Sequence, residues 1–404
     1  MLLREGGMII ALSLTATLMA ATHPVNVHGD EEIGTVEQVY DGALFPDIQT
    51  NTFRNIDRLF PTRTVRHGAR VYPLPYAANA LKSLDIPSGG KTWDLYDYVS
   101  LNRVAGVIIV KDGEIVLENY HLGNNENTRW MSMSVVKSIT ATLVGAAIHD
   151  GSIKSIDDQI TRYLPRFSGT AYDGVTVRNL IQMASGVKWN ETYTDPESDR
   201  RSMLEAQTSL RPGAVLELMA SLPRAAEPGT LWNYSTGETH LVGALVRAAT
   251  GKPVSDYLSE KIWANFGMEA DATWWLESPG GLEVGGSGLA ATLRDYARFG
   301  MFLLNDGRIG DERILPEGWV AEAGSAKIIN GERVDYGYML WPIENAKGTL
   351  NEGAYAAMGI FGQYVYVNPR ENIVIAVWGA QPKPVDTEVI PSSDFFAAVS
   401  AALR

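Results

Sequence analysis

The sequence contains no cysteine among its 404 residues. This absence excludes disulfide bonds, thiolate catalysis and a lipid-modified N-terminal cysteine, although it does not decide the cellular compartment. Positive charge is also scarce, because 34 Lys and Arg residues stand against 47 Asp and Glu residues and give a formal net charge of −13. We find no basic stripe, so the charge argues against nucleic acid as a partner.

Motifs of several enzyme classes are missing as well. A nucleophile elbow needs G-x-S-x-G, and the nearest string, residues 285–289, lacks the final glycine. There is no H-E-x-x-H, no EF-hand loop, no Walker A motif and no Rossmann fingerprint after a predicted strand. The six histidines are far apart, so no pattern supports a metal site or a His-based triad. We therefore expect neither a metal ion nor an organic cofactor.

The N-terminus has the features of an export signal. Arg4 precedes an apolar stretch over residues 8–20, and small residues follow that stretch. The stretch is shorter than the roughly 20 apolar residues that a membrane-spanning helix needs. We predict a signal peptide over residues 1–29 and a periplasmic or secreted protein with no stable membrane span. The alternative is an ordinary apolar N-terminus on a cytoplasmic protein.

The rest of the chain divides by pattern into three parts. Its length allows two or three domain-sized units, and 45% hydrophobic with 20% charged residues is typical of a soluble globular protein. Residues 30–90 are rich in turn formers and predict an extended arm. Residues 91–133 and 290–404 predict a sheet domain, and residues 134–289 predict a mostly helical domain. The expected fold class is α+β.

Two hairpins and several helices support this division. Apolar runs flank the turn Asp112-Gly113 and predict a hairpin over 105–118. A second hairpin is predicted over 363–378, near the other end of the chain. Sheet pairing between the chain ends is therefore expected. Helical periodicity predicts helices at 93–101, 134–149, 176–185, 237–250, 254–265, 292–305 and 394–403.

The pattern that points most clearly to chemistry is Ser134-x-x-Lys137, at the start of a long apolar helix. Positions i and i+3 share one face of a helix, so the two side chains are neighbours. A partly desolvated lysine has a lowered pKa and can take the proton of a serine hydroxyl. The backbone N–H of a serine at a helix start is unpaired, and it can face an oxyanion.

The spacing alone is weak evidence. Lys91 and Lys188 also have a serine three residues before them, Ser88 and Ser185, but neither pair begins a helical pattern. A structural interpretation of Ser134 also exists, in which it caps a buried helix and Lys137 reaches toward solvent.

Two further segments could complete a Ser–Lys site. Tyr234 follows a turn and precedes a small-residue helix start, and a phenol held near an ammonium has a lowered pKa and can act as base and then as acid. A core tyrosine with a satisfied hydroxyl is the alternative. Residues 358–363 contain glycines that let a backbone approach a ligand closely, so their N–H groups could complete an oxyanion hole.

Taken in order, these segments resemble the serine β-lactamase and penicillin-binding protein superfamily, class C-like branch. Within it they are most similar to 6-aminohexanoate-dimer (nylon oligomer) hydrolases and related carboxylesterases. The resemblance runs from about residue 100 to residue 380. The stretches that carry it are MSMSVVKS (131–138), GAAIHDGSI (145–153), the segment 171–199, GTLWNYST (229–236), GGSGLAATLRDYARFG (285–300) and MGIFGQYVYVNP (358–369).

The resemblance implies an antiparallel sheet built from both chain ends and flanked by helices, with a cleft beside a mostly helical domain. It implies that Ser134 is the acylated nucleophile and that Lys137 and Tyr234 share the general base and acid work, in an order that stays open. The oxyanion would lie between the N–H groups of Ser134 and Ile360. Tyr193 corresponds to a tyrosine over the substrate.

Some positions depart from the family pattern. Ala357-Met358-Gly359 replaces K-T-G or H-x-G, so no cation is available there for a β-lactam carboxylate. Thr236 replaces a common Asn, and Phe361 stands where the hydrolases carry His. An acidic residue of those hydrolases falls on Leu204, with Glu205 adjacent. Aromatic residues on segments expected to line the cleft are Trp189, Tyr193, Trp232, Phe361 and Tyr364.

We therefore predict a serine hydrolase that cleaves a small-molecule ester or small amide through a Ser134 acyl-enzyme. One alternative is an acyltransferase of the same fold, in which another alcohol or amine replaces water. The other is a member that binds peptide or cell-wall ligands without turnover. The departures favour esters over amides and disfavour β-lactams.

Overall fold

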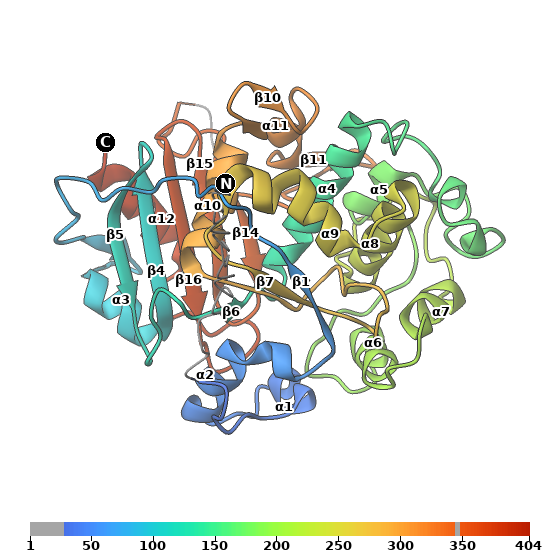
Figure 1. Cartoon of the computed structure of the whole chain (residues 1–404), viewed down its shortest axis with the longest axis horizontal. Helices are drawn as coiled ribbons and strands as arrows, with labels where there is room; N and C mark the ends of the chain where they lie inside the picture. The colour runs from blue at the N-terminus through green and yellow to red at the C-terminus, as the bar shows by residue number, and fades with distance from the viewer. Residues whose placement is uncertain (1–27, 344–347) are drawn as a thin grey trace, which may run out of the picture.

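The computed structural model of this chain describes residues 28–343 and 348–404 (Figure 1). The predicted signal peptide, residues 1–29, lies almost wholly outside the described residues and stays a prediction. None of the helices in the described ranges is both long and apolar enough to cross a membrane.

The core of the fold is a six-stranded antiparallel sheet with the order β13-β14-β15-β16-β4-β5. β16 pairs with β4, which joins the N-terminal hairpin to the C-terminal one and confirms a sheet built from both parts of the chain. The strands are β4 (Val104–Lys111), β5 (Glu114–Tyr120), β13 (Trp341–Pro342), β14 (Tyr355–Gly359), β15 (Gln363–Asn368) and β16 (Ile373–Gly379).

Both faces of this sheet are covered, and the two-residue period of its strands explains how. Val107 and Ile109 of β4 belong to a core with α3 (Leu95–Leu101) and α12 (Ser392–Ala402), whereas Ile108 and Val110 belong to a core on the opposite face. On that opposite face α10 (Leu293–Leu304) packs against β15 and β16, and α4 (Val135–His149) packs against β14. The predicted α+β class is confirmed.

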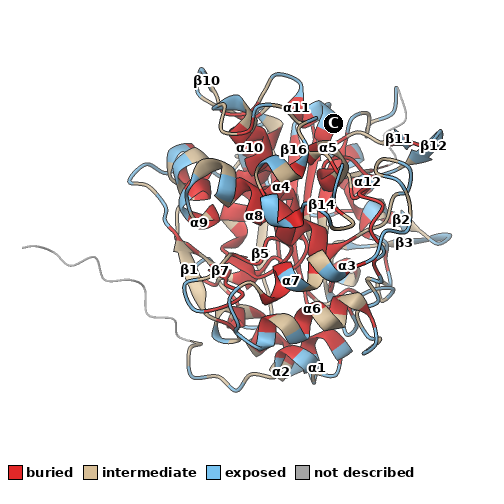
Figure 2. Cartoon of the chain, turned by 90° about the vertical axis from the view of Figure 1, so that its right-hand side faces the viewer, coloured by how far each residue is buried: buried red, intermediate tan, exposed pale blue. Residues whose placement is uncertain are grey.

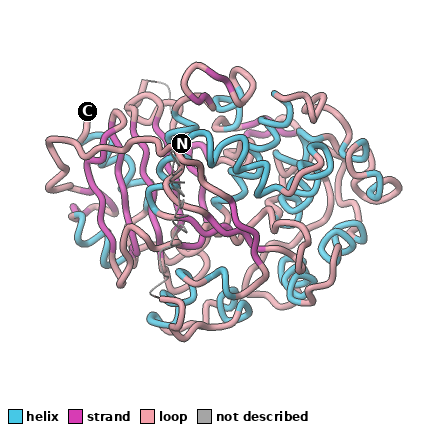
Figure 3. Tube along the Cα trace, in the orientation of Figure 1, coloured by secondary structure: helices cyan, strands magenta, loops and turns pink. Residues whose placement is uncertain are grey.

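The helices between the two parts of the sheet gather on one side of it (Figure 3). α4 and α8 are their buried centre, with buried residues along most of each helix (Figure 2). The helices of this part are α5 (Val177–Ile181), α6 (Asp199–Thr208), α7 (Ala214–Ser221), α8 (Thr236–Thr250), α9 (Val254–Leu258) and the π-helix η4 (Ser259–Gly267) that continues it.

A second sheet, in the order β1-β7-β8-β6, joins distant parts of the chain. Its strands are β1 (Thr62–Val65), β6 (Trp130–Met131), β7 (Ala272–Trp275) and β8 (Leu289–Ala291). The remaining short elements are β2 (Ile86–Ser88), β3 (Lys91–Trp93), β9 (Arg308–Ile309), β10 (Glu312–Arg313), α11 (Trp319–Ala323), β11 (Lys327–Ile329), β12 (Glu332–Val334) and the 3₁₀ turns η1 (Ile56–Arg58), η2 (Ile160–Arg162) and η3 (Pro165–Phe167).

The prediction of an extended arm over 30–90 is wrong for its first part. Two helices, α1 (Val36–Asp41) and α2 (Pro46–Arg54), lie there. Residue types that are common in turns start helices here, because Thr35 forms a capping box with Gln38 and Pro46 occupies the first turn of α2.

Candidate active site

The turn that carries Ser134 is held by the second sheet. β6 ends at Met131, and the Ser132 N–H donates to the Leu289 carbonyl of β8 at 2.7 Å. Met133 then adopts a left-handed conformation with φ of +40°, unusual for a residue with a side chain. Ser134 precedes the first residue of α4, and its side chain does not cap the helix. The hydroxyl is thus available for another partner.

That partner is Lys137. Its Nζ lies 3.0 Å from the Ser134 Oγ and donates to the Gly286 carbonyl at 2.7 Å. Burial of Lys137, which is 1% exposed, lowers the pKa of its amine from 10.5 to about 7. A Cβ added to Gly286 would lie 2.8 Å from Thr236 Cγ2, 3.0 Å from the Thr236 carbonyl oxygen and 3.1 Å from Nζ, so a larger residue here would push its neighbours apart.

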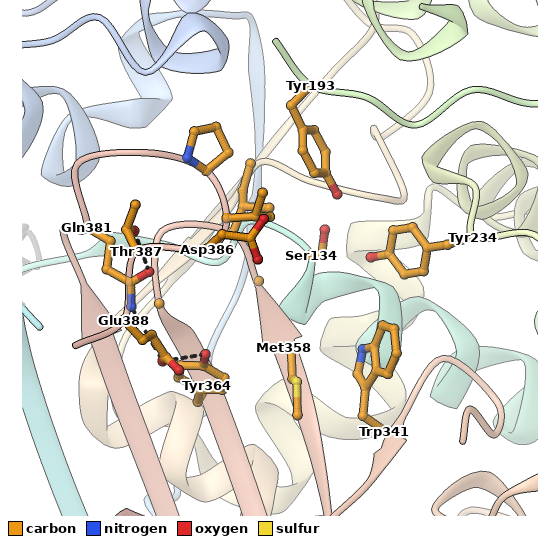
Figure 4. Close-up of a pocket in the computed structure, with 15 residues that line it drawn as sticks. Ser134, Tyr193, Tyr234, Trp341, Met358, Tyr364, Gln381, Asp386, Thr387 and Glu388 are labelled. Carbon is orange, nitrogen blue, oxygen red and sulfur yellow. Dashed lines mark hydrogen bonds between the residues drawn. The ribbon is translucent and has the colours of Figure 1, made fainter. Parts of the chain in front are cut away.

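Tyr234 reaches the same point from the helical side. It precedes Ser235, the N-cap of α8, and its hydroxyl points at that of Ser134 (Figure 4). Its ring lies 5.4 Å from the Lys137 amine. Burial raises the pKa of the phenol well above its ordinary value, and the negative charge of Glu191 raises it further. The lowered pKa that we expected for Tyr234 beside an ammonium is therefore wrong, because burial outweighs the interactions that lower it.

Glu191 is a residue that the sequence patterns did not single out. Its carboxylate accepts from the Trp189 indole at 2.5 Å, from the Thr236 N–H at 2.9 Å and from the Thr236 hydroxyl. It therefore fixes the first residue of α8, two positions after Tyr234. It also raises the pKa of Lys137, opposing the effect of burial, while Arg200 lowers it. Three donors on one carboxylate could not be foreseen from an isolated glutamate in a loop.

The end of β14 lies against the nucleophile turn. A Cβ added to Gly359 would lie 3.0 Å from the Ser134 nitrogen and 2.7 Å from the Ser132 carbonyl oxygen, so a larger residue would force the strand away. Ile360 follows directly, which brings its backbone beside that of Ser134. The Ser134 N–H lies at a helix start and has no partner within the helix, so it can face an oxyanion, and the Ile360 N–H is the candidate for the second donor.

A pocket of about 580 Å³ opens at Ser134. Tyr193, Tyr234, Trp341, Met358 and Ile360 form part of its lining, and the segment Gln381–Glu388 forms the opposite wall (Figure 4). Of the aromatic residues expected at the cleft, Tyr193 and Tyr364 line it.

Three of those aromatic residues do not line the pocket. Phe361 is fully buried with φ of +66°, and its ring packs on Phe53 at 5.1 Å. The chain turns sharply after Ile360, which directs the Phe361 side chain away from the pocket into the core. Trp232 packs on Tyr336 instead, and Trp189 is buried beside Glu191.

The pocket wall carries negative charge. Asp386 is exposed, with its carboxylate directed toward Ser134 (Figure 4), while Glu388 accepts from the Tyr364 hydroxyl at 2.7 Å. No Lys or Arg belongs to the lining in the described part of the chain. Lys383 of the same segment turns outward, because its amine donates to the Gly42 carbonyl. Leu204 is buried and the neighbouring Glu205 is exposed, and neither lines the pocket.

The competing Ser–Lys pairs have no such surroundings. Ser88 and Lys91 face each other across the short hairpin of β2 and β3, and Ser185 donates to the buried Glu238. Among the described residues, His, Asp and Glu side chains nowhere gather in threes in a way that could hold a metal ion.

Comparison with known proteins assigns most of the chain to one family. Residues 102–396 match the family model described as Beta-lactamase, which covers most of the chain. The chain belongs to the beta-lactamase family. The resemblance inferred from the motifs is confirmed, and so is the fold that it implies, a sheet built from both parts of the chain.

Within the beta-lactamase family the similar proteins are hydrolases of several kinds. A 6-aminohexanoate-dimer hydrolase of Paenarthrobacter ureafaciens is 28% identical over 292 residues, which are 69% of this chain and 72% of that protein. A Bacillus anthracis structure, provisionally assigned as a 6-aminohexanoate-dimer hydrolase, matches with a TM-score of 0.78 and 22% identity over 88% of this chain and 94% of its own. A family VIII carboxylesterase matches with a TM-score of 0.56 and 18% identity, covering 75% and 95%. The chain is thus related to serine hydrolases of the beta-lactamase fold.

Proposed function

We propose that this protein is a serine hydrolase that cleaves a small ester, and more slowly a small amide, through an acyl-enzyme on Ser134. The observation that carries the proposal is the Ser134 hydroxyl 3.0 Å from a buried lysine amine whose pKa lies near 7. The adjoining pocket has room for a small acyl or alcohol group.

Acylation would begin with the Ser134 Oγ attacking the substrate carbonyl while the neutral Lys137 amine takes the hydroxyl proton. The N–H groups of Ser134 and Ile360 would stabilise the resulting oxyanion. Tyr234, whose raised pKa keeps it protonated at neutral pH, would donate its proton to the leaving oxygen or nitrogen and recover one from Lys137. Deacylation would reverse these steps. Water would attack the acyl carbon while its proton passes through Tyr234 to Lys137, and Lys137 would return a proton to the Ser134 Oγ as the acid leaves.

If Lys137 is the base, activity should depend on pH with a defined sign. The amine is protonated below its pKa of about 7 and cannot accept a proton, so kcat/KM for p-nitrophenyl butyrate should rise about tenfold per unit below pH 7 and level off above it. Thermal melts at each pH would show whether the protein stays folded. A profile that falls from pH 5 to pH 8 would contradict the assignment of Lys137.

The charges around the pocket support a substrate ranking. The lining contains two carboxylates, Asp386 and Glu388, and no Lys or Arg among the described residues, so an anionic substrate would be repelled. An amide also needs its leaving nitrogen protonated, whereas a phenolate leaves easily. We expect kcat/KM to fall in the order p-nitrophenyl butyrate, butyryl p-nitroanilide, nitrocefin.

A panel of these three substrates tests the proposal directly. Asp386→Asn is the matched variant, because it keeps the side-chain size and removes one charge; the ratio of nitrocefin to ester turnover should rise in it. No turnover of any of the three, together with no labelling by a fluorophosphonate, would refute the hydrolase proposal. A kcat/KM for nitrocefin or the anilide that exceeds the value for the ester would refute the ranking but not the hydrolase proposal.

A further inference from the structure

The two walls of the pocket come from distant parts of the chain, near Tyr193 and at Gln381–Glu388. In the described part of the chain, no hydrogen bond or ion pair joins them directly. Residues 36–54, which comprise α1, α2 and their connection and are called the brace below, contact both. We propose that the brace fixes the separation of the two walls and thereby makes Asp41 and Arg201 positioning residues for substrate selectivity. The inference rests on the proposed function in taking this pocket as the substrate site.

The contacts with the first wall pass through two arginines of α6. The Tyr40 ring lies 4.2 Å from the guanidinium of Arg200, which is 2% exposed. The carboxylate of Asp41 pairs with Arg201 at 2.5 Å, and the same Arg201 nitrogen donates to the Tyr193 carbonyl at 3.2 Å. Arg201 therefore connects the carboxylate of Asp41 on α1 to the backbone of Tyr193, which lines the pocket.

The contacts with the second wall follow directly along the chain. The Gly42 carbonyl accepts from the Lys383 amine at 2.8 Å. Gly42 has φ of +60°, and an added Cβ would lie 2.8 Å from Lys383 Cδ and 3.2 Å from Pro384 Cδ, so it packs against a lining residue. From α2, the Gln49 amide donates to the Gln381 carbonyl at 2.8 Å.

The brace also packs behind Phe361, the residue that follows the candidate oxyanion donor Ile360. Phe53 of α2 packs on Phe361, and the Phe361 N–H donates to the Pro384 carbonyl at 2.9 Å. In Figure 1 α1 and α2 lie beneath both the sheet and α6, and Figure 2 shows them against α6 from the side. Asp41 is thus connected to one wall through Arg201, and the adjacent Gly42 contacts the other wall, so the brace links the two sides of the pocket. Residues 36–54 lie outside the part matched by the family model.

Weakening the contacts of the brace should raise KM most for substrates that are long enough to contact both walls of the pocket. In Asp41→Asn, KM for p-nitrophenyl butyrate should rise about twofold to fivefold, the range for loss of one exposed ion pair, with kcat within about twofold. The kcat/KM for p-nitrophenyl acetate, whose acyl group is too short to contact both walls, should change less than about twofold. Arg201→Gln should raise KM for p-nitrophenyl butyrate in the same way. In the double variant the rise in KM should be smaller than the two single effects combined, because both changes break the same ion pair.

Two further measurements separate this inference from a general loss of stability or a wrong function. Glu37→Gln removes an exposed charge from the same helix and is the matched control. Hydrogen exchange should quicken at residues 190–195 and 381–388 in Asp41→Asn and not in Glu37→Gln, and this readout needs no turnover. Unchanged exchange in both segments, or equal effects of the two variants, would overturn the brace. Failure of Ser134 to react with a fluorophosphonate would overturn the proposed function instead.

Discussion

Replacing Ser134 by alanine should abolish both ester hydrolysis and covalent labelling by a fluorophosphonate. The hydroxyl is the group that would form the acyl bond, and no other hydroxyl lies beside Lys137 in the hydrogen bonds of the described residues. The fold should survive, because Ser134 does not cap α4 and loss of even a true N-cap costs only about 1 kcal/mol. Labelling followed by mass spectrometry of the intact protein, with a thermal melt beside it, measures both effects.

The matched control is Ser88→Ala. Ser88 also lies three residues before a lysine, Lys91, but the two residues belong to a two-stranded hairpin. The substitution should leave labelling and turnover as in the parent protein. A labelled Ser88 or Ser185 in the Ser134→Ala protein would contradict our choice of nucleophile. The Ser185 hydroxyl donates to the buried Glu238 inside the protein, so we expect no label on it.

The parts of the fold that the sequence predicts well are those set by local chemistry. Asp112 and Gly113 have φ of +52° and +84°, the conformation that a two-residue hairpin turn needs and that these residue types tolerate. The α4 and α10 helices lie within a residue or two of their predicted ranges, since apolar residues recur with helical spacing. The predicted helix 176–185 ends early, at Ile181, and Met183 just beyond it adopts a left-handed conformation.

The parts that the sequence could not predict depend on contacts between distant residues. Gly286 contacts Lys137 from 149 positions away, and Glu191 contacts Thr236 from 45 positions away. Neither glycine nor glutamate carries a local signal for such a role. The same holds for the pKa of Tyr234, whose direction follows from burial by the surrounding chain and not from the neighbouring lysine.

The sequence does not decide which of Lys137 and Tyr234 accepts the first proton. The surroundings of the two groups in the structure suggest an order that can be tested. The pKa of the lysine is lowered to about 7, so it can accept a proton, whereas the pKa of the tyrosine is raised, so it holds one. Two groups whose environments move their pKa values apart are suited to opposite roles, one as base and one as acid. If this assignment is right, removing the Tyr234 hydroxyl should slow the reaction by an amount that depends on the leaving group of the substrate.

Tyr234→Phe keeps the ring and its stacking on Trp341 at 5.8 Å, and removes only the hydroxyl. The kcat for an alkyl ester such as ethyl butyrate should fall by roughly 10²–10⁴-fold, the range of general acid–base catalysis, with KM little changed. The loss in kcat/KM for p-nitrophenyl butyrate should be smaller, because p-nitrophenolate leaves without a proton.

The control is Tyr172→Phe, a fully buried tyrosine away from the pocket whose hydroxyl has no hydrogen-bond partner among residues 28–343 and 348–404, so its removal should leave both rates near those of the parent. Equal losses for the alkyl and p-nitrophenyl esters in Tyr234→Phe would mean that Tyr234 does not protonate the leaving group. A near-normal kcat for the alkyl ester would make Tyr234 a packing residue, and Lys137 would then have to carry both proton transfers, since its amine is the other titratable group in contact with the Ser134 hydroxyl.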